Sequence, residues 1–385
     1  MRIARAGALV VAMLAWGSPA AAQSSLTSLT ETVDTGGVLV RYTSAAGDPR
    51  RIDAATAGAL AANAQAALAA QTTRLAMPPP LDPKVDVYVT TIPASTEEPF
   101  GRTIPRIPAN PQSAAYILIQ PGKAKDKEVV THEMFHVLQY AVTVGAPKLL
   151  SEGLAEWAGY HLTPEVTELR TYDPRAPLDC ATEGECGGGL PGYSSWPFWE
   201  YASERFGESF GRRVYDQQAL LGRTAAPTAA LEAALRARGS NLSASFREFA
   251  AKSLRGDFTG PLLKGEDFAR SLPVDYVLGT KPKKLRARRF TLDRLSTAYL
   301  EVGREGSRCR PGRLTLQVSG ASTPTAFIAA GQTGKRTKAV RTAGGRAKIA
   351  ARFKSCRRAG LGVALINAGT AGKVTFKVTG AFTVR

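Results

Sequence analysis

The sequence predicts an α+β protein that ends in an all-β part. Short β-branched runs and one long alanine-rich helix occupy residues 23–122, and helical patterns dominate residues 123–280. Short alternating runs then fill residues 281–385. The charge changes at the same place: residues 281–385 hold 24 Lys and Arg against 3 Asp and Glu, whereas residues 1–280 hold 26 against 29. We therefore expect successive parts of the chain over 23–122, 123–280 and 281–385.

Residues 1–22 have the pattern of a secretory signal peptide. Arg2 and Arg5 precede an apolar run from Ala6 to Trp16, and Ala20-Ala21-Ala22 provides a small-residue cleavage site. A retained membrane anchor is the alternative, but the run is too short and wrongly flanked for a spanning helix, and no later segment is long enough to cross a bilayer. We expect a protein that is not transmembrane and is exported, to the periplasm or out of the cell, after cleavage near Ala22.

The four cysteines agree with an oxidising compartment, where even numbers are favoured. Cys180 and Cys186 lie within one loop, and Cys309 and Cys356 lie together in the last quarter of the chain. We expect the disulfides Cys180–Cys186 and Cys309–Cys356, although three pairings are possible. A four-thiolate zinc site is the alternative, but no CxxC spacing supports it.

The elements before residue 122 are read from periodicity and end signals. Gly37 to Thr43, Lys84 to Thr90 and Ser113 to Gln120 are predicted strands, because each is rich in β-branched or alternating apolar residues. Asp53 can cap a helix over Ala54 to Met77 that stops at three prolines. Its apolar stripe is suited to covering a sheet and consists of Leu60, Ala64, Leu68 and Leu75.

The helical region after Lys123 contains a motif that carries chemistry, VVTHEMFHVLQY from Val129 to Tyr140. On a helix, His132 and His136 stand one turn apart, so both imidazoles can reach a single ion. Glu133 is rotated by about 100° from His132, beside the metal rather than on it. This position suits a carboxylate that accepts a proton from water.

A second helix, LLSEGLAEWAGY, brings two more carboxylates. Glu152 can supply the third protein ligand that a catalytic zinc site requires, and Glu156, one turn further, can hydrogen-bond a histidine ring from outside the site. Gly153 and Ala155 are small and would let this helix approach the first. The alternative is that two core histidines are satisfied by neighbours and both glutamates are solvated.

With these motifs and GYSSWPFWEYASERFG (Gly192 to Gly207), the chain resembles the gluzincin metallopeptidases, in the peptidase MA-like group related to aminopeptidase N and thermolysin. The resemblance covers roughly Gly37 to Leu254. It implies a zincin-like catalytic domain, with a small mixed sheet whose strand Ser113 to Gln120 lines the substrate cleft, over a helical lobe that holds the HExxH helix.

The resemblance also implies roles for single residues. His132, His136 and Glu152 would bind one Zn²⁺ per chain, Glu133 would act as general base, and Glu156 would support a ligand. The gap from His136 to Glu152 is shorter than in these families, and thermolysin-like spacing would choose Glu156 as ligand instead. The E-G-x-A setting of Glu152 favours the aminopeptidase pattern.

A hydrogen-bond donor for the transition state is expected as well. Tyr193 opens the helix that supplies such a tyrosine in these families and is the first candidate, before Tyr201 and His161. The substrate implied is a peptide or protein. The aminopeptidase G-x-M-E-N stretch, which binds a free amino terminus, is missing, and this favours an endopeptidase.

The C-terminal part invites three interpretations. Its strands are expected in TAYLEV, RLTLQV, TAFIAA, AKIAARF, GVALIN and KVTFKV, as in a β-sandwich. The basic run Lys281 to Phe290 could be a solvated linker, or the whole part could bind anionic surfaces such as lipid headgroups or cell-wall polymers. Nucleic acid is disfavoured, because no aromatic residues interleave the charges. The alternative to an exported zinc peptidase is therefore an inactive protein on a zincin scaffold that binds anionic cell-surface polymers through this part.

Overall fold

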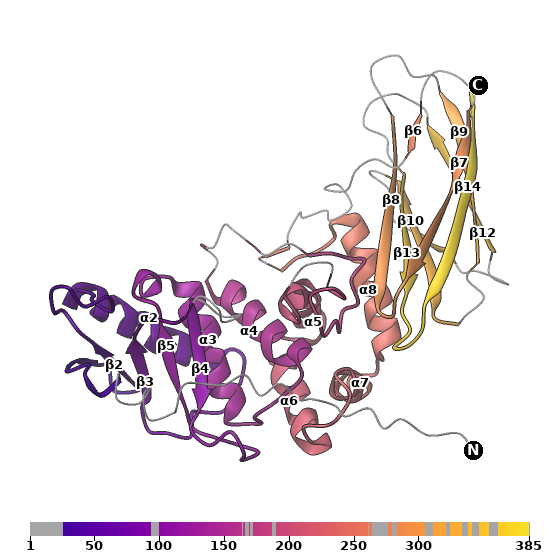
Figure 1. Cartoon of the computed structure of the whole chain (residues 1–385). Helices are drawn as coiled ribbons and strands as arrows, with labels where there is room; N and C mark the ends of the chain where they lie inside the picture. Colours follow the sequence, from indigo (N-terminus) through magenta and orange to yellow (C-terminus); the bar gives the residue numbers. More distant parts are fainter. Residues whose placement is uncertain are drawn as a thin grey trace, which may run out of the picture.

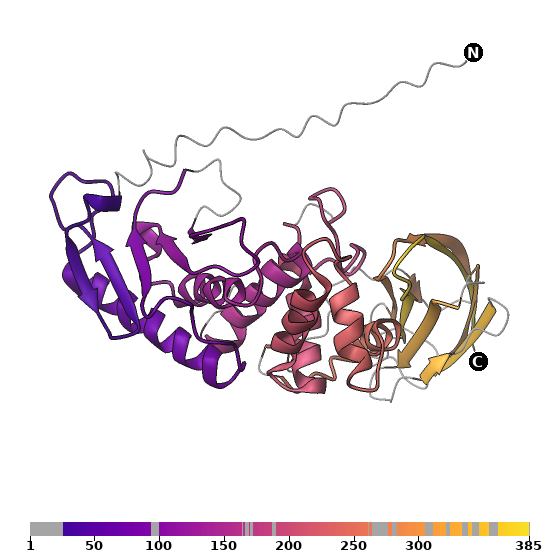
Figure 2. The same ribbon diagram turned by 90° about the horizontal axis from the view of Figure 1, so that it is seen from below.

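The computed structural model describes residues 26–93, 100–163, 165, 169, 172–186, 190–260, 262–263, 276–278, 283–304, 311–320, 324–332, 338–340, 346–353 and 361–384. Within these ranges the fold is α+β, as predicted. A mixed sheet, a group of helices and a β-sandwich follow one another along the molecule (Figures 1 and 2).

The N-terminal sheet has the described strand order β1-β2-β3-β5-β4. The strands are β1 (Glu31–Asp34), β2 (Val38–Tyr42), β3 (Val85–Val89), β4 (Gly101–Pro105) and β5 (Ala115–Ile119). The three predicted strands are β2, β3 and β5, which run parallel, while β1 and β4 are antiparallel edge strands that the prediction missed. Strand β4 is therefore the sheet edge that lies next to the helices.

Helix α2 (Ala54–Thr73) covers the buried face of this sheet. Asp53 caps it as predicted, accepting a hydrogen bond of 2.6 Å from the backbone N–H of Thr56. The helix ends at Thr73, with Arg74 as C-cap, four residues before the predicted end at Met77. The predicted stripe is buried in the core, together with β-branched residues of β2, β3 and β5.

The helical part follows the sheet, and its first α-helix packs on β4 and β5. Its elements are η1 (Pro121–Lys123), α3 (Lys127–Tyr140), α4 (Lys148–Leu162), η2 (Tyr193–Ser195), α5 (Trp196–Phe206), α6 (Phe210–Leu221), α7 (Ala229–Arg236) and α8 (Leu242–Arg255). Aromatic side chains, including Trp157, Phe198 and Phe249, fill the space between these helices. The same hydrophobic core extends without a break from the N-terminal sheet to α8.

The C-terminal part forms two sheets, which the described residues give as β11-β10-β13-β8-β6 and β12-β9-β14-β7. Their strands are β6 (Tyr276–Leu278), β7 (Lys283–Leu292), β8 (Ser296–Arg304), β9 (Gly312–Ser319), β10 (Ala326–Gln332), β11 (Lys338–Val340), β12 (Arg346–Phe353), β13 (Leu361–Asn367) and β14 (Val374–Val384). A second hydrophobic core lies between the sheets. Each of the six predicted runs lies in one of these strands, except that Thr325 and Lys373 precede β10 and β14 by one residue.

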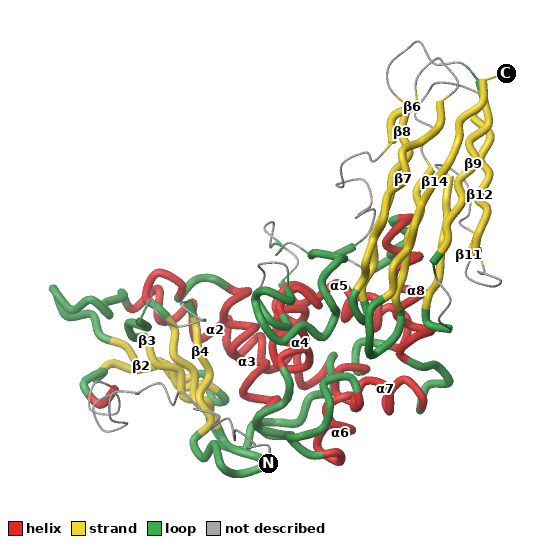
Figure 3. The backbone as a smooth tube through the Cα atoms, turned by 45° about the vertical axis from the view of Figure 1, so that its right-hand side comes forward, coloured by secondary structure: helices red, strands yellow, loops and turns green. Residues whose placement is uncertain are grey.

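The first of these two sheets also packs on helix α8, so it is buried on both faces (Figure 3). The hydroxyl of Tyr299 donates to the backbone carbonyl of Ala250, and the guanidinium of Arg247 lies 4.4 Å from the ring centre of Phe327. The linker interpretation of the basic run is wrong for its described residues, because Lys283–Leu292 forms β7 and pairs with β14.

The structure contains the predicted disulfide Cys180–Cys186, with a Cα–Cα distance of 5.3 Å. The other predicted pair, Cys309 and Cys356, lies outside the described residues, as do residues 1–22. Among the helices of the described ranges, none is long and apolar enough to cross a membrane.

Candidate metal centre

Helix α3 positions the two histidines of the motif. The carboxylate of Asp126 caps its first turn by accepting from the backbone N–H of Val129. Nearly the whole helix is buried, because one side packs on the N-terminal sheet and α2 while another faces α4. His132 and His136 are therefore held between two helices, with only 5% and 4% of their surfaces exposed.

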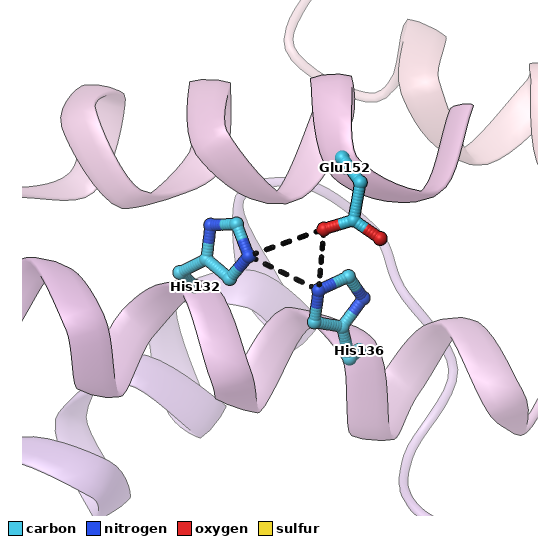
Figure 4. Close-up of side chains that lie close together, drawn as sticks. All are labelled: His132, His136 and Glu152. Carbon is cyan, nitrogen blue, oxygen red and sulfur yellow. Dashed lines mark hydrogen bonds and ion pairs between the residues drawn. The ribbon is translucent and has the colours of Figure 1, made fainter. Parts of the chain in front are cut away.

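Three donor atoms converge between α3 and α4 (Figure 4). The Nε2 atoms of His132 and His136 are 3.1 Å apart, and Oε2 of Glu152 lies 3.6 Å and 3.4 Å from them respectively. Donor atoms around a four-coordinate zinc at about 2.0–2.1 Å would be about 3.3–3.4 Å apart. The buried group His132, His136 and Glu152 could therefore hold a metal ion.

The far side of each imidazole has its own partner. Nδ1 of His136 lies 2.6 Å from Oε1 of Gln139, whose amide nitrogen donates to the backbone carbonyl of Ser151. Nδ1 of His132 lies 3.3 Å from Oε2 of Glu156. A carboxylate or amide oxygen at Nδ1 favours the tautomer that carries its proton there, which leaves the Nε2 lone pair for a metal.

This geometry distinguishes Glu152 from Glu156. Glu152 faces both Nε2 atoms, while Glu156 faces the opposite nitrogen of His132 and also accepts from the hydroxyl of Tyr160. A second group, Glu128, His132 and Glu156, could also hold a metal ion, but it contains only one of the histidines.

Oε2 of Glu152 is buried and has no hydrogen-bond partner among the described residues. The other oxygen, Oε1, lies 3.3 Å from the hydroxyl of Ser151 and 3.5 Å from Nζ of Lys148. A buried carboxylate oxygen that nothing hydrogen-bonds is costly unless a cation neutralises it. The orphaned oxygen is the one that points to the two histidines, so the donor set suits a divalent cation.

The electrostatic field of the site favours a positive charge. Burial alone would raise the pKa of Glu152, but His136 and His132 hold it well below 4.5. Burial alone would lower the pKa of His132, but Glu152 and Glu156 raise it well above 6.5. The surrounding carboxylates therefore outweigh desolvation, and they would attract a cation in the same way.

Glu133 is held beside the donor group by strand β4. Its Oε2 accepts a hydrogen bond of 2.8 Å from the hydroxyl of Thr103. A Cβ atom added to Gly101 would lie 2.7 Å from Cγ and 2.8 Å from Oε1 of Glu133. The carboxylate therefore occupies space that only a glycine at position 101 leaves open, and it lies outside the group of three donors.

Tyr193 lies next to His132. The two rings are stacked, with centroids 5.5 Å apart and planes 7° from parallel. Gly192, at φ +85°, brings Tyr193 there, and a Cβ atom on Gly192 would lie within 2.1 Å of the carbonyl oxygen of Lys148.

Gly153 was expected to let α4 approach α3. Instead it faces Ser195 and Trp199, so its small size serves the approach of η2 and α5.

The other two candidates for a hydrogen-bond donor to the transition state lie elsewhere. Tyr201 packs against Phe198 and Phe249, and His161 lies between the carboxylates of Glu200 and Glu208. Among the described residues, the ring contacts of Tyr201 and the ion pairs of His161 are thus with side chains outside the group of His132, His136 and Glu152.

Sequence reasoning also missed four residues at the site. Thr103 and Gly101 belong to the unpredicted strand β4, and Gln139 could have been found from its position one turn after His136. Tyr215 on α6 has a buried hydroxyl without a hydrogen-bond partner in the described part of the chain. Burial raises the pKa of Tyr215 well above 10.0, and the negative charge of Glu152 adds to this effect.

Comparison with known proteins gives little further information. No protein-family model matches the chain, and no curated protein matches it. Among solved structures, the pre-peptidase C-terminal domain of a collagenase from Bacillus anthracis is 8% identical, covering 28% of this chain and 97% of that one at a TM-score of 0.20. A periplasmic inhibitor of g-type lysozyme from Aeromonas hydrophila is 11% identical, covering 28% and 95% at 0.18. A family GH115 4-O-methyl-alpha-glucuronidase with specificity for decorated arabinogalactans is 9% identical, covering 70% and 46% at 0.18. At such TM-scores, none of the three similarities establishes a shared fold.

Proposed function

We propose that this protein is an exported metal-dependent hydrolase that cleaves peptide bonds, with zinc as its ion. The observation that carries the proposal is the convergence of His132, His136 and the orphaned oxygen of Glu152. Two imidazoles and one carboxylate are a common donor set for catalytic zinc, which needs a remaining position for water or substrate. When bound there, zinc would acidify a water molecule and polarise a carbonyl group.

Glu133 is the proton-transfer residue in this proposal. It is buried, it is not one of the three donors, and Thr103 holds one of its oxygens. The carboxylate would accept a proton from water through its other oxygen, Oε1, and later return it to the leaving amine. Because Gly101 and Thr103 fix the carboxylate before substrate arrives, little reorganisation is needed during the reaction.

Tyr193 is the proposed donor to the charge that develops on the carbonyl oxygen of the substrate. Its ring is held flat against His132, next to the donor group, by the tight turn at Gly192. A hydroxyl in such a water-poor site stabilises a developing oxyanion more strongly than it would in water. The resemblance of the HEMFH and SEGLAEW segments to gluzincin peptidases supports peptides as the substrate class.

The experiment that tests the proposal measures metal content and hydrolysis together. Elemental mass spectrometry on purified wild type should find about one zinc per chain, retained in Glu133→Gln and lost in His136→Ala. Labelled, denatured casein should be cleaved by wild type alone. A metal-loaded wild type that leaves casein intact would favour the inactive scaffold, and full activity in Glu133→Gln would remove Glu133 from the mechanism.

Ligand identity has a separate test. Glu152→Gln should abolish zinc binding, because it removes the carboxylate that faces both Nε2 atoms. Glu156→Gln should bind zinc about 10- to 100-fold more weakly, since it perturbs only the partner of His132 Nδ1. The reverse order of the two affinities would make Glu156 the ligand.

Export is supported by the disulfide Cys180–Cys186 together with the signal-like residues 1–22. Sequencing the amino terminus of protein recovered from outside the cytoplasm should give a start near residue 23. An intact terminus on cytoplasmic protein would contradict this part of the proposal.

A further inference from the structure

All charged residues in the strands of the outer sheet of the β-sandwich, β12-β9-β14-β7, are positive. Strands β7, β9, β12 and β14, all within the described residues, contain ten Lys and Arg and no Asp or Glu. The inner sheet packs on α8, so the outer sheet lies on the far side of the sandwich, with one face against the second hydrophobic core and the other exposed (Figure 3).

Exposed cations lie on the outward face, and six of them, in regular strand pairing, make up what we call the basic face. Strand alternation places them there, because the residues beside them in sequence, such as Leu314, Phe353 and Phe376, are buried in the core. The basic face consists of Lys284, Arg289, Arg313, Lys348, Arg352 and Lys377.

Two pairs on this face set like charges directly opposite each other. Arg313 on β9 is in register with Arg352 on β12, and Arg289 on β7 is in register with Lys377 on β14. Directly opposed like charges destabilise a sheet. An anion that bound beside either pair would interact with two cations at once, so the register favours an anionic occupant.

The spacing of the two pairs indicates an extended occupant. Arg313 and Ser319 are six residues apart on β9, and Ser319 is in register with Lys377. The pairs are therefore about 20 Å apart along the strands. One small anion cannot neutralise both, whereas a chain with regularly spaced negative groups can.

The residues between the pairs indicate the kind of chain. They are hydroxyl and amide side chains, among them Thr315, Gln317 and Thr379, which can bond sugar hydroxyls. Membrane insertion would favour large exposed apolar side chains, and the described residues of this sheet have none. They also have no exposed aromatic ring on which a nucleic-acid base could stack.

We propose that the basic face binds an anionic polysaccharide, a linear polymer whose sulfate, phosphate or carboxylate groups bridge the opposed cations. This function is separate from the metal centre, and the sheet that carries it is not the one that packs on the helical part. The polymer would run diagonally over the four strands and contact both charge pairs at once.

The test compares two variants with the same net charge. The face variant replaces Arg289, Arg313, Arg352 and Lys377 with Thr, which suits strands. The control variant replaces four exposed cations outside the sandwich with Gln, namely Arg51, Lys125, Arg213 and Arg236. Binding of the full-length proteins is titrated against dextran sulfate, unsubstituted dextran, phosphatidylglycerol vesicles and an oligothymidine strand.

Wild type should bind dextran sulfate and not dextran at about 0.15 M salt. The face variant should bind at least about tenfold more weakly, with a slope of log affinity against log salt that is smaller by about 3, and the control should stay within about twofold of wild type. If the face variant does not fold, the separate Arg313/Arg352 and Arg289/Lys377 double variants, each of which removes one repulsive pair, carry the same comparison.

Three results would overturn the proposal. If the wild-type protein does not bind dextran sulfate, the proposal is wrong. Equal weakening in the face and control variants would show that net charge alone is responsible. Tighter binding to the vesicles or to the oligothymidine than to dextran sulfate would replace the polysaccharide with a membrane or a nucleic acid.

Discussion

On the proposed function, replacing Gly101 with Ala should slow peptide hydrolysis without removing the metal. The new Cβ atom would lie 2.7 Å from Cγ of Glu133. Carbon atoms in contact prefer separations of about 3.5 Å, so the side chain of Glu133 must move by about 0.8 Å. A displacement of about 1 Å in a reacting group can cost about 100-fold in rate, and we expect kcat to fall about 10- to 100-fold.

The assay measures kcat on labelled casein and zinc content on the same preparations. Gly122→Ala is the matched control, because no described atom lies within 4 Å of the Cβ it would add, and it should behave as wild type. Glu133 is not among the three donor residues, so the Gly101→Ala protein should keep its zinc. Unchanged kcat would refute the argument that β4 fixes a catalytic carboxylate. Loss of zinc would refute the separation between Glu133 and the metal ligands.

Three further predictions concern the surroundings of the site. Gln139→Leu should weaken zinc binding about 10- to 100-fold in a chelator competition, while Gln139→Glu, which keeps an acceptor for Nδ1 of His136, should stay closer to wild type; equal affinities would contradict the role of this bond. Tyr193→Phe keeps the ring but removes the hydroxyl, so kcat should fall about 100-fold with zinc content unchanged, and an unaltered kcat would exclude the hydroxyl as a donor. Burial alone would lower the pKa of His161, but Glu200 raises it above 6.5, so the charged histidine stabilises the fold below pH 6.5 and this contribution is lost as pH rises through the raised pKa. The difference in urea midpoint between wild type and His161→Gln should therefore shrink as pH rises above 6.5, and a constant difference would contradict this.

The three converging side chains of the candidate metal centre could be predicted because they belong to local patterns. Two histidines four residues apart on a helix must share a face, and the spacing of Glu152 and Glu156 follows the same rule on α4. The wider arrangement could not be predicted in this way. Thr103 meets Glu133 across 30 residues of sequence, and its strand contains Gly and Pro, which are unfavourable in strands.

Strand β7 was misread for a related reason. Its five basic residues in ten are what a solvated linker would contain. The edge of a sheet also tolerates charge on both sides of a strand, so the same sequence can form β7. What makes it a strand is its pairing with β14, about 90 residues later in the chain, and no local signal reports such a partner. The expectation for Gly153 failed similarly, since sequence shows that a residue is small but not which neighbour uses the space.

The packing of the inner sandwich sheet on α8 has a consequence for how the chain unfolds. Tyr299, Ala364 and Ile366 belong to the same core as the helices, so we expect the parts on either side of residue 280 to stabilise each other. A chain cut at that point would expose the apolar surface of α8 around Ala250 and Leu254 to water. Heating should therefore melt the helical and sandwich parts in a single cooperative transition, although their net charges have opposite signs.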